Sequence, residues 1–429
     1  MQRRSLLLGG LSLAATAIAA PAIRAASPVN LRMSWWGGND VHRAQLQALE
    51  AFQRRHPHIR IKAEYTGWAG HLERLTTQIA GGTAPDVMQI NWNWLRLFSR
   101  HGDGFYDLNR LPGLIDLTQF PEDAIAMSTV EGHLNGLPPS MTARLFYFNE
   151  TTFSKAGLSV PDSWDALLAA GPIFRDRLGP DYFPLDVNFQ DLTAMLYSWQ
   201  IQRRPAPFID EVTRELGPDL SDLTAMAEFY QQLVAQHVIP SARERASYGN
   251  VQPQELRPWI SGRYAGTYQW TSSVGKFADT LEPGQRLTLA PYPMLPGASV
   301  AGLLYKPSMM FAINRDTPEA EAAALLVNFM LNDPEGVAIL GARRGVPASR
   351  AAEQVLAANG GLDPLALAGK RQVESLPRAI HLSGYFEHAR VRDGFNDILE
   401  KQGYGRLTPE QAGKAFNREI NAILHRVIR

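Results

Sequence analysis

The chain has 429 residues, of which 45% are hydrophobic and 20% charged, as in folded globular proteins, and its length predicts two domains instead of one hydrophobic core. Lysine plus arginine and aspartate plus glutamate each number 42, a balance that excludes the strong basic field of a nucleic-acid-binding protein. The chain contains no cysteine, which excludes disulfides, thiol catalysis and thiolate metal sites.

The N-terminus has the pattern of an export signal over residues 1–26. Arg3 and Arg4 precede an uncharged stretch rich in leucine and alanine, and small residues near Ala25 follow it. Paired arginines at this place favour the twin-arginine export route. A buried N-terminal helix is the alternative interpretation.

Removal of the signal takes away Arg3, Arg4 and Arg24, which leaves 39 basic residues (42 − 3) against 42 acidic ones. No later segment approaches the roughly 20 apolar residues that a membrane-spanning helix needs. We therefore expect a soluble, monomeric protein in a periplasm, with no nucleic acid among its partners.

The first quarter of the mature chain predicts a β-α-β-α-β unit. Residues 31–35 and 59–65 alternate apolar and polar side chains, the pattern of strands. Apolar residues at helical spacing predict a helix over 40–56, and a second helix over about 71–80 precedes a short strand at 87–91. This order implies a parallel sheet flanked by helices.

All three predicted strands end in the same kinds of residue, aromatic side chains beside polar ones. The sequences are WWGGND at 35–40, YTGWAGH at 65–71 and QINWNW at 89–94, and each combines aromatic residues with polar ones. Ligands of open parallel sheets gather at the carboxyl ends of the strands, so we expect a ligand site here.

The remainder of the chain has a different sequence pattern, with more helical periodicity. Residues 142–307 contain longer helical stretches and scattered aromatic residues, residues 309–314 predict another strand, and residues 318–332 predict an amphipathic helix. The C-terminal part is mostly helical. No repeat or glycine/serine linker is present, so we expect short ordered segments between the domains.

Four stretches in order carry a resemblance to a known family. They are the export signal, AGGTAPDVMQIN at 80–91, GLPPSMTARLFYFNETTFSKAGLSVPDSWDAL at 136–167, and FAINRDTPEAEAAALLVNFMLNDPEG at 311–336. Together they resemble the extracellular solute-binding proteins of sugar-transporting ABC importers, typified by maltodextrin-binding proteins. The stretches SWWGGND and GFYDLN are similar to members that bind oligogalacturonides or related uronate-containing oligosaccharides.

The resemblance implies a type II periplasmic binding fold, in which two α/β lobes with parallel-type sheets enclose a ligand cleft. The N-terminal lobe is expected to hold residues 27–141 and 312–344, and the C-terminal lobe residues 142–311 and 345–429. A membrane permease is the expected protein partner, and no cofactor is expected.

Aromatic residues are the first candidates for the site, because a pyranose presents an apolar face that an aromatic ring can cover. Trp35 and Trp36 are neighbours on a strand, so only one of them can face the cleft. Trp68 lies in a loop flanked by glycines. Trp92, which shares a face with Trp94 if the chain stays extended there, and Trp270 complete the set.

Polar and charged candidates would replace the hydrogen bonds of the sugar hydroxyls. They are Asn39, Asp40, Gln89 and Asn91, although Asp40 could instead cap the following helix. A uronate adds a carboxylate, which suits the planar fork of arginine. The resemblance places four cations near the lobe crossings, where ion pairs between the lobes or at the surface are the alternative role: Arg144, Lys306, Arg343 and Arg344.

An exported pectin-degrading enzyme is the competing function of another class. It would need two carboxylates at a set separation, or a basic residue with a bound cation. No HExxH motif, phosphate loop or nucleophile elbow is present. We therefore expect a binding protein without catalytic residues or a metal, whose ligand is an acidic oligosaccharide or, alternatively, a neutral one.

Overall fold

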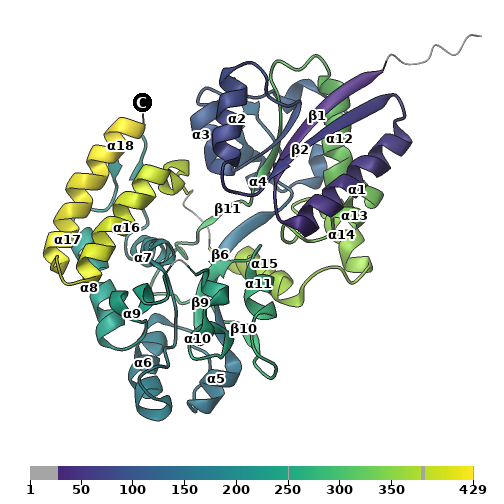
Figure 1. Cartoon of the computed structure of the whole chain (residues 1–429). Coiled ribbons are helices and arrows are strands. Elements are labelled where there is room, and N and C mark those ends of the chain that lie inside the picture. The colour runs from purple at the N-terminus through teal and green to yellow at the C-terminus, as the bar shows by residue number, and fades with distance from the viewer. Residues whose placement is uncertain (1–27, 250, 378–381, 429) are drawn as a thin grey trace, which may run out of the picture.

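The structure, a computed structural model, describes residues 28–249, 251–377 and 382–428, and the predicted export signal lies outside them. Two lobes are visible in Figure 1, and strands β6 (Met141–Asn149) and β11 (Tyr305–Pro307) lie where they meet. The predicted α/β fold in two lobes is confirmed.

The first lobe is built on a four-stranded sheet with the order β12-β3-β1-β2. Its strands are β1 (Val29–Trp36), β2 (Ile59–Thr66), β3 (Val87–Ile90) and β12 (Met310–Ile313). β1 pairs with β2 and β3 in parallel, as predicted, whereas β12 is antiparallel to β3. The sheet therefore includes Met310 and Phe311, which the expected boundary assigns to the second lobe.

Helix α1 (Asn39–Arg55) covers the sheet of the first lobe through residues at helical spacing. Its Ala48, Leu49 and Phe52 are buried in one hydrophobic cluster with Leu31 and Met33 of β1. Full burial of a leucine or phenylalanine side chain contributes about 1.5–3 kcal/mol, so this face anchors the helix.

The cap of α1 differs from the expectation. The N-cap residue is Gly38, and no side chain in the part of the chain that the structure describes caps the helix. Asp40 lies inside the first turn, where its negative charge is favourable near the helix N-terminus, but it is not the cap.

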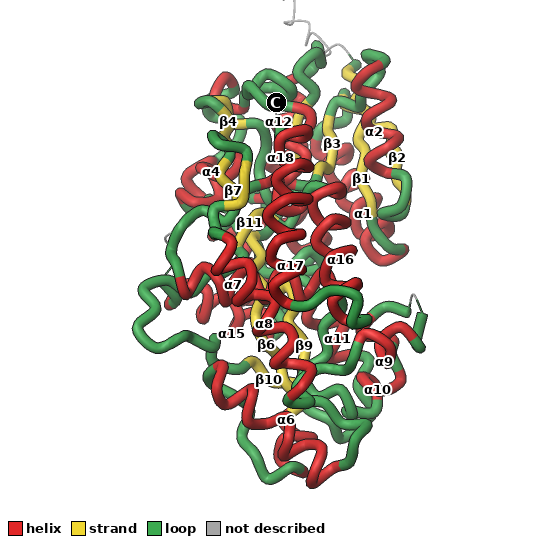
Figure 2. The backbone as a smooth tube through the Cα atoms, turned by 90° about the vertical axis from the view of Figure 1, so that its left-hand side faces the viewer, coloured by secondary structure: helices red, strands yellow, loops and turns green. Residues whose placement is uncertain are grey.

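The second lobe is built around β6, which pairs with β9 (Gly266–Trp270), β10 (Leu287–Leu289) and β11. All three pairings are antiparallel, in contrast to the parallel-type sheets expected in both lobes. Figure 2 shows β1, β2 and β3 at the top of the molecule and β6, β9 and β10 below them. The short strands elsewhere are β4 (Thr129–Val130), β5 (His133–Leu134), β7 (Ile209–Asp210) and β8 (Glu215–Leu216).

The remaining helices follow the predicted pattern of longer helices in the middle and a helical C-terminus. α14 packs against α13. In chain order they are α2 (His71–Ala80), α3 (Leu95–Phe98), α4 (Glu122–Ser128), α5 (Glu150–Lys155), α6 (Trp164–Leu178), α7 (Phe189–Arg203), α8 (Leu220–Ala235), α9 (Ala242–Ala246), α10 (Arg257–Ile260), α11 (Val274–Asp279), α12 (Ala320–Leu331), α13 (Pro334–Leu340), α14 (Arg350–Ala358), α15 (Pro364–Ser375), α16 (Ala389–Gly403), α17 (Pro409–Ala415) and α18 (Asn421–Val427).

Within the described ranges, no single helix has the length and apolar character needed to cross a membrane. α12 and α13 meet that test only when taken together, and the pair is bent by 63° at its break.

Candidate functional site

A cleft of about 610 Å³ lies between residues of both lobes. Its volume is in the range of small-molecule sites in proteins. Both lobes contribute side chains to its lining. The main ones are Trp36, Trp68, Asn91 and Trp94 from the first lobe and Arg144, Trp270, Lys306, Tyr385 and Glu387 from the second.

The first-lobe wall of the cleft is aromatic. The Trp36 ring meets Trp68 at 5.2 Å and Trp94 at 5.5 Å between centroids, and Trp68 stacks on Trp94 at 5.9 Å. Trp68 is 57% exposed, because Gly70, with φ of +77°, turns the loop before α2 and leaves the indole outside the core. The wall therefore offers flat apolar surface to the cleft.

The structure separates the two neighbouring tryptophans of β1. Trp36 faces the cleft, whereas Trp35 points to the opposite side of the strand and is fully buried. The Trp35 Nε1 donates to His42 Nδ1 at 3.1 Å, and its ring stacks on Tyr65. Trp35 is therefore a core residue, which corrects its place among the site candidates.

Trp92 also leaves the candidate site. Residues Trp92–Trp94 form the 3-10 helix η1, so these two tryptophans do not share a face as they would on an extended strand. The Trp92 Nε1 donates to the Met127 carbonyl at 2.8 Å and the ring is buried, while Trp94 lines the cleft. The sequence Trp-Asn-Trp therefore does contain a cleft residue, but it is Trp94 and not the predicted Trp92.

Of the four polar candidates, only Asn91 lines the cleft, and its Oδ1 accepts from the Trp92 backbone N–H at 3.0 Å to cap η1. Gln89 is fully buried beside the cleft, with Nε2 donating to Met309 Sδ at 3.0 Å. Asn39 and Asp40 are exposed on the first turn of α1 and do not line the cleft, and Asp40 pairs with Arg43. Asn39 and Asp40 follow the end of β1 closely in sequence, but this proximity does not determine whether the first turn of α1 faces the cleft or solvent.

The second-lobe wall carries charge. Arg144 is buried and donates through Nη1 to Asp191 at 2.6 Å and to the Tyr268 carbonyl at 2.8 Å. Lys306 is also buried, and its Nζ lies 2.8 Å from a carboxylate oxygen of Glu387. Each cation thus has a carboxylate partner within the protein.

Strand pairing explains why these cations meet Trp270. Arg144 of β6 is opposite Trp270 of β9, and Lys306 of β11 is opposite Thr142 of β6, so all four side chains share one face of the sheet. The Arg144 guanidinium lies 4.8 Å and the Lys306 ammonium 5.0 Å from the Trp270 ring centroid, a favourable cation–π arrangement.

The lobes touch along one side of the cleft. Arg96 of α3 lies 3.3 Å from Glu211, and Asn93 Nδ2 donates to the Glu387 carbonyl at 3.2 Å. Glu387 ends the 3-10 helix η5 (Gly384–Glu387) of the second lobe. One short segment therefore both bridges the lobes and supplies a carboxylate to Lys306.

The cleft is basic although the whole chain is neutral. Five of its charged side chains are cationic and two are anionic, which favours an anionic ligand. They are Arg96, Arg100, Arg144, Lys306 and Arg392 against Glu73 and Glu387. Arg144 and Lys306 are predicted from the family resemblance, whereas the other five follow no sequence motif.

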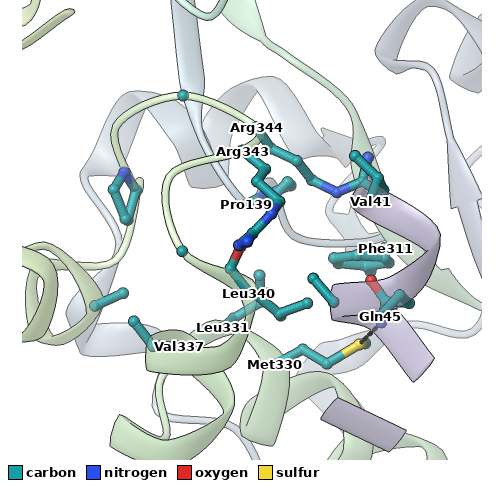
Figure 3. A pocket seen from close by; sticks show the side chains of 15 residues that line it. Val41, Gln45, Pro139, Phe311, Met330, Leu331, Val337, Leu340, Arg343 and Arg344 are labelled. Carbon is teal, nitrogen blue, oxygen red and sulfur yellow. Dashed lines mark hydrogen bonds between the residues drawn. The ribbon is translucent and has the colours of Figure 1, made fainter. Parts of the chain in front are cut away.

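Arg344 does not line the cleft but a neighbouring small cavity of about 40 Å³. Figure 3 shows it reaching from its loop toward Val41, beside Arg343. Burial lowers the pKa of the Arg344 guanidinium to about 10, so it stays charged at neutral pH. Its Nη1 lies 2.6 Å from Met309 Sδ, and Met309 itself lines the cleft.

His71 supports the aromatic wall from behind. Burial lowers its pKa to about 4, so the imidazole is neutral at neutral pH. Its Nε2 faces the Gln89 carbonyl at 3.4 Å, and its Nδ1 lies 3.0 Å from Thr66 Oγ1. A neutral ring that donates to the carbonyl and accepts from the hydroxyl satisfies both contacts.

The described residues include no group of three or more His, Asp or Glu side chains that could hold a metal ion. The residues that line the cleft offer aromatic faces, hydrogen-bonding groups and cations, which suit the recognition of a polar ligand with an apolar face.

The family model of the bacterial extracellular solute-binding proteins matches residues 42–337. The chain belongs to this family. The predicted resemblance is therefore confirmed.

Solved structures of this solute-binding family are similar over nearly the whole chain. A periplasmic oligogalacturonide-binding protein from Yersinia enterocolitica, in complex with saturated digalacturonic acid, is 45% identical, with a TM-score of 0.87, 94% of this chain covered and 100% of that chain. A periplasmic solute-binding protein from Pectobacterium atrosepticum is 40% identical with a TM-score of 0.90, at the same coverage of 94% and 100%.

A putative binding protein from Brucella abortus is 32% identical over 139 residues. This match spans 31% of the present chain and 32% of the length of that curated relative.

Proposed function

We propose that this solute-binding protein captures an acidic, uronate-containing oligosaccharide in a periplasm and delivers it to the permease of an ABC importer. The observation that carries the proposal is the pairing of an aromatic wall with a basic one across a single cleft. The similarity to the oligogalacturonide-binding protein from Yersinia enterocolitica supports the same ligand class.

Each wall has a distinct part in the proposed recognition. The rings of Trp36 and Trp68 remove the apolar face of a pyranose from water, and Asn91 hydrogen-bonds its hydroxyls. Lys306 and Arg144 attract the carboxylates from the opposite wall. A ligand that touches both walls binds the closed arrangement of the lobes better, so it shifts their equilibrium toward closure, which the permease then recognises.

Calorimetry on the purified mature protein tests the proposal. We expect the galacturonic acid dimer to bind at least roughly tenfold more tightly than the galactose dimer of the same linkage, because a hydrogen bond to a charged group contributes about 1.5–3 kcal/mol. The preference should change little as salt is raised, since Arg144 and Lys306 are buried and salt screens buried charges much less than exposed ones.

Two results would contradict the proposal. Equal affinity for both dimers would point to a neutral ligand, and shortened products in the incubated sample, detected by chromatography, would point to a pectin-degrading enzyme.

A further inference from the structure

Arg344, a half-buried residue whose Nη2 atom is buried, differs from the two buried cations beside the cleft. Arg144 has Asp191 at 2.6 Å and Lys306 has Glu387 at 2.8 Å, whereas no described carboxylate pairs with Arg344. Its Nη2 is buried without a hydrogen-bond partner among the described residues. A buried charge without a counter-charge costs free energy, so such a group is stabilised when an anion arrives.

The side chain in front of Arg344 is a poor partner for it. That side chain is Met309, whose Sδ accepts hydrogen bonds from Arg344 Nη1 at 2.6 Å and from Gln89 Nε2 at 3.0 Å. A thioether sulfur is only a weak acceptor, yet two strong donors from separate elements converge on it. This arrangement is complementary to a stronger acceptor at the same place.

Met309 lies between this pair of donors and the cleft. It is half-buried and lines the cleft, while Arg344 lines the smaller cavity behind it and Gln89 is fully buried. Methionine is unbranched and has three rotatable bonds, so its side chain can turn aside without movement of the backbone. Such a turn of the Met309 side chain would open the Arg344 fork and the Gln89 amide to the cleft.

The backbone around both residues is held in place. The Ser140 hydroxyl donates to the Arg344 carbonyl and lies 2.7 Å from the Ser308 hydroxyl, next to Met309. The backbone at Arg344 is thus held, and Gln89 is held by the pairing of β3 with β12, where it lies opposite Phe311, while the Met309 side chain remains the adaptable part.

We propose that Met309 is a displaceable cover over a carboxylate-binding subsite formed by Arg344 and Gln89, which takes one carboxylate of an acidic sugar. The proposal rests on the proposed function and deepens it. Arg344 contributes a planar pair of donors, Gln89 a third one, and the carboxylate supplies the counter-charge that the guanidinium lacks. Lys306 on the opposite wall serves a second carboxylate, so the protein prefers oligosaccharides with at least two acidic residues.

The test compares Arg344→Gln with Arg343→Gln by calorimetry, using the galacturonic acid dimer and the galactose dimer. Both variants remove one positive charge from adjacent positions, but Arg343 is exposed and, among the described residues, donates to the Ile339 and Leu340 carbonyls alone. We expect Arg344→Gln to lower affinity for the acidic dimer by roughly tenfold or more and to leave the neutral dimer within about twofold. Arg343→Gln should change neither.

A second variant keeps the test informative if Arg344→Gln folds poorly. Met309→Ala removes the cover without a change of charge, so we expect a several-fold gain in affinity for the acidic dimer only. Equal changes for both dimers, or no change in either variant, would overturn the subsite. If the wild-type protein itself lacks a preference for the acidic dimer, the proposed function fails, whereas a preference that survives Arg344→Gln refutes only the subsite.

Discussion

The two walls of the cleft hold their functional side chains in different ways. On the first lobe, Trp36 and Trp68 contact other rings and depend on shape alone. On the second lobe, Arg144 and Lys306 are each bound to an internal carboxylate. The aromatic wall is ready for a ligand as it stands, whereas the charged wall must balance ligand contacts against contacts it already has.

This difference separates affinity from selectivity. An aromatic face binds acidic and neutral pyranoses about equally, because both have the same apolar C–H surface. A cation distinguishes them, but its net contribution depends on how strongly an internal carboxylate competes for it. Substitutions on the two walls should therefore have different signatures.

The largest expected effect is on stability and comes from Arg144. Arg144→Ala would remove the counter-charge of the buried Asp191 and leave it only the neutral Gln269 amide at 2.9 Å among the described side chains, so we expect the free energy of unfolding to fall by about 3–5 kcal/mol. Urea unfolding followed by tryptophan fluorescence measures it. Arg144→Ala combined with Asp191→Ala is the control and should recover part of the loss; a loss below about 1 kcal/mol would mean that the pair is not structural.

The next effect concerns selectivity at Lys306. Lys306→Gln should lower affinity for the acidic dimer by roughly tenfold and change the neutral dimer little, because only the charge is lost. Glu387→Gln is the matched opposite: it frees Lys306 from its internal partner, so affinity for the acidic dimer should rise. If both variants weaken binding of both dimers equally, the ion pair only shapes the cleft.

A smaller effect, without selectivity, is expected from the aromatic wall. Trp68→Ala should weaken binding of both dimers by about 1 kcal/mol and leave stability within about 0.5 kcal/mol, since the ring is 57% exposed. Tyr65→Ala is the control, because Tyr65 is also aromatic and 44% exposed but does not line the cleft. A loss confined to the acidic dimer would contradict the division between the walls.

The same division explains what the sequence could predict. The β-α-β-α-β unit and the aromatic residues at its strand ends follow local periodicity, and α2 begins and ends at the predicted residues. The choice between Trp35 and Trp36 required the side of the strand that faces the cleft, and the choice between Trp92 and Trp94 required the 3-10 turn of η1. Short-range patterns do not contain that information.

The charged wall was harder to predict because its partners are far apart in sequence. Arg144 was selected as a ligand-facing cation, but Asp191, 47 positions later, already binds it. Glu387 meets Lys306 only because η5 returns to the cleft from the C-terminal part of the chain. Gln89 and Arg344 both contact Met309 Sδ, and no local sequence pattern predicts these two contacts.

The smallest effect tests whether His71 supports the aromatic wall in its neutral form. Burial holds its pKa at about 4 in the folded state, against an ordinary value near 6.5. Between these values the unfolded chain binds more protons, so the stability that this group contributes is complete above about pH 6.5 and is lost as the pH falls toward 4.

His71→Gln removes this titration while an amide can still reach both partners of the ring. The difference in free energy of unfolding between wild type and His71→Gln should therefore shift in favour of wild type as pH rises from 4 to 6.5, and stay constant above that range. Carboxylates and other histidines titrate in both proteins, so their effects cancel in the difference. A pH-independent difference would mean that the pKa of His71 is not lowered by folding, so that the ring packed against Trp36 and Trp94 becomes charged in the folded protein below about pH 6.5.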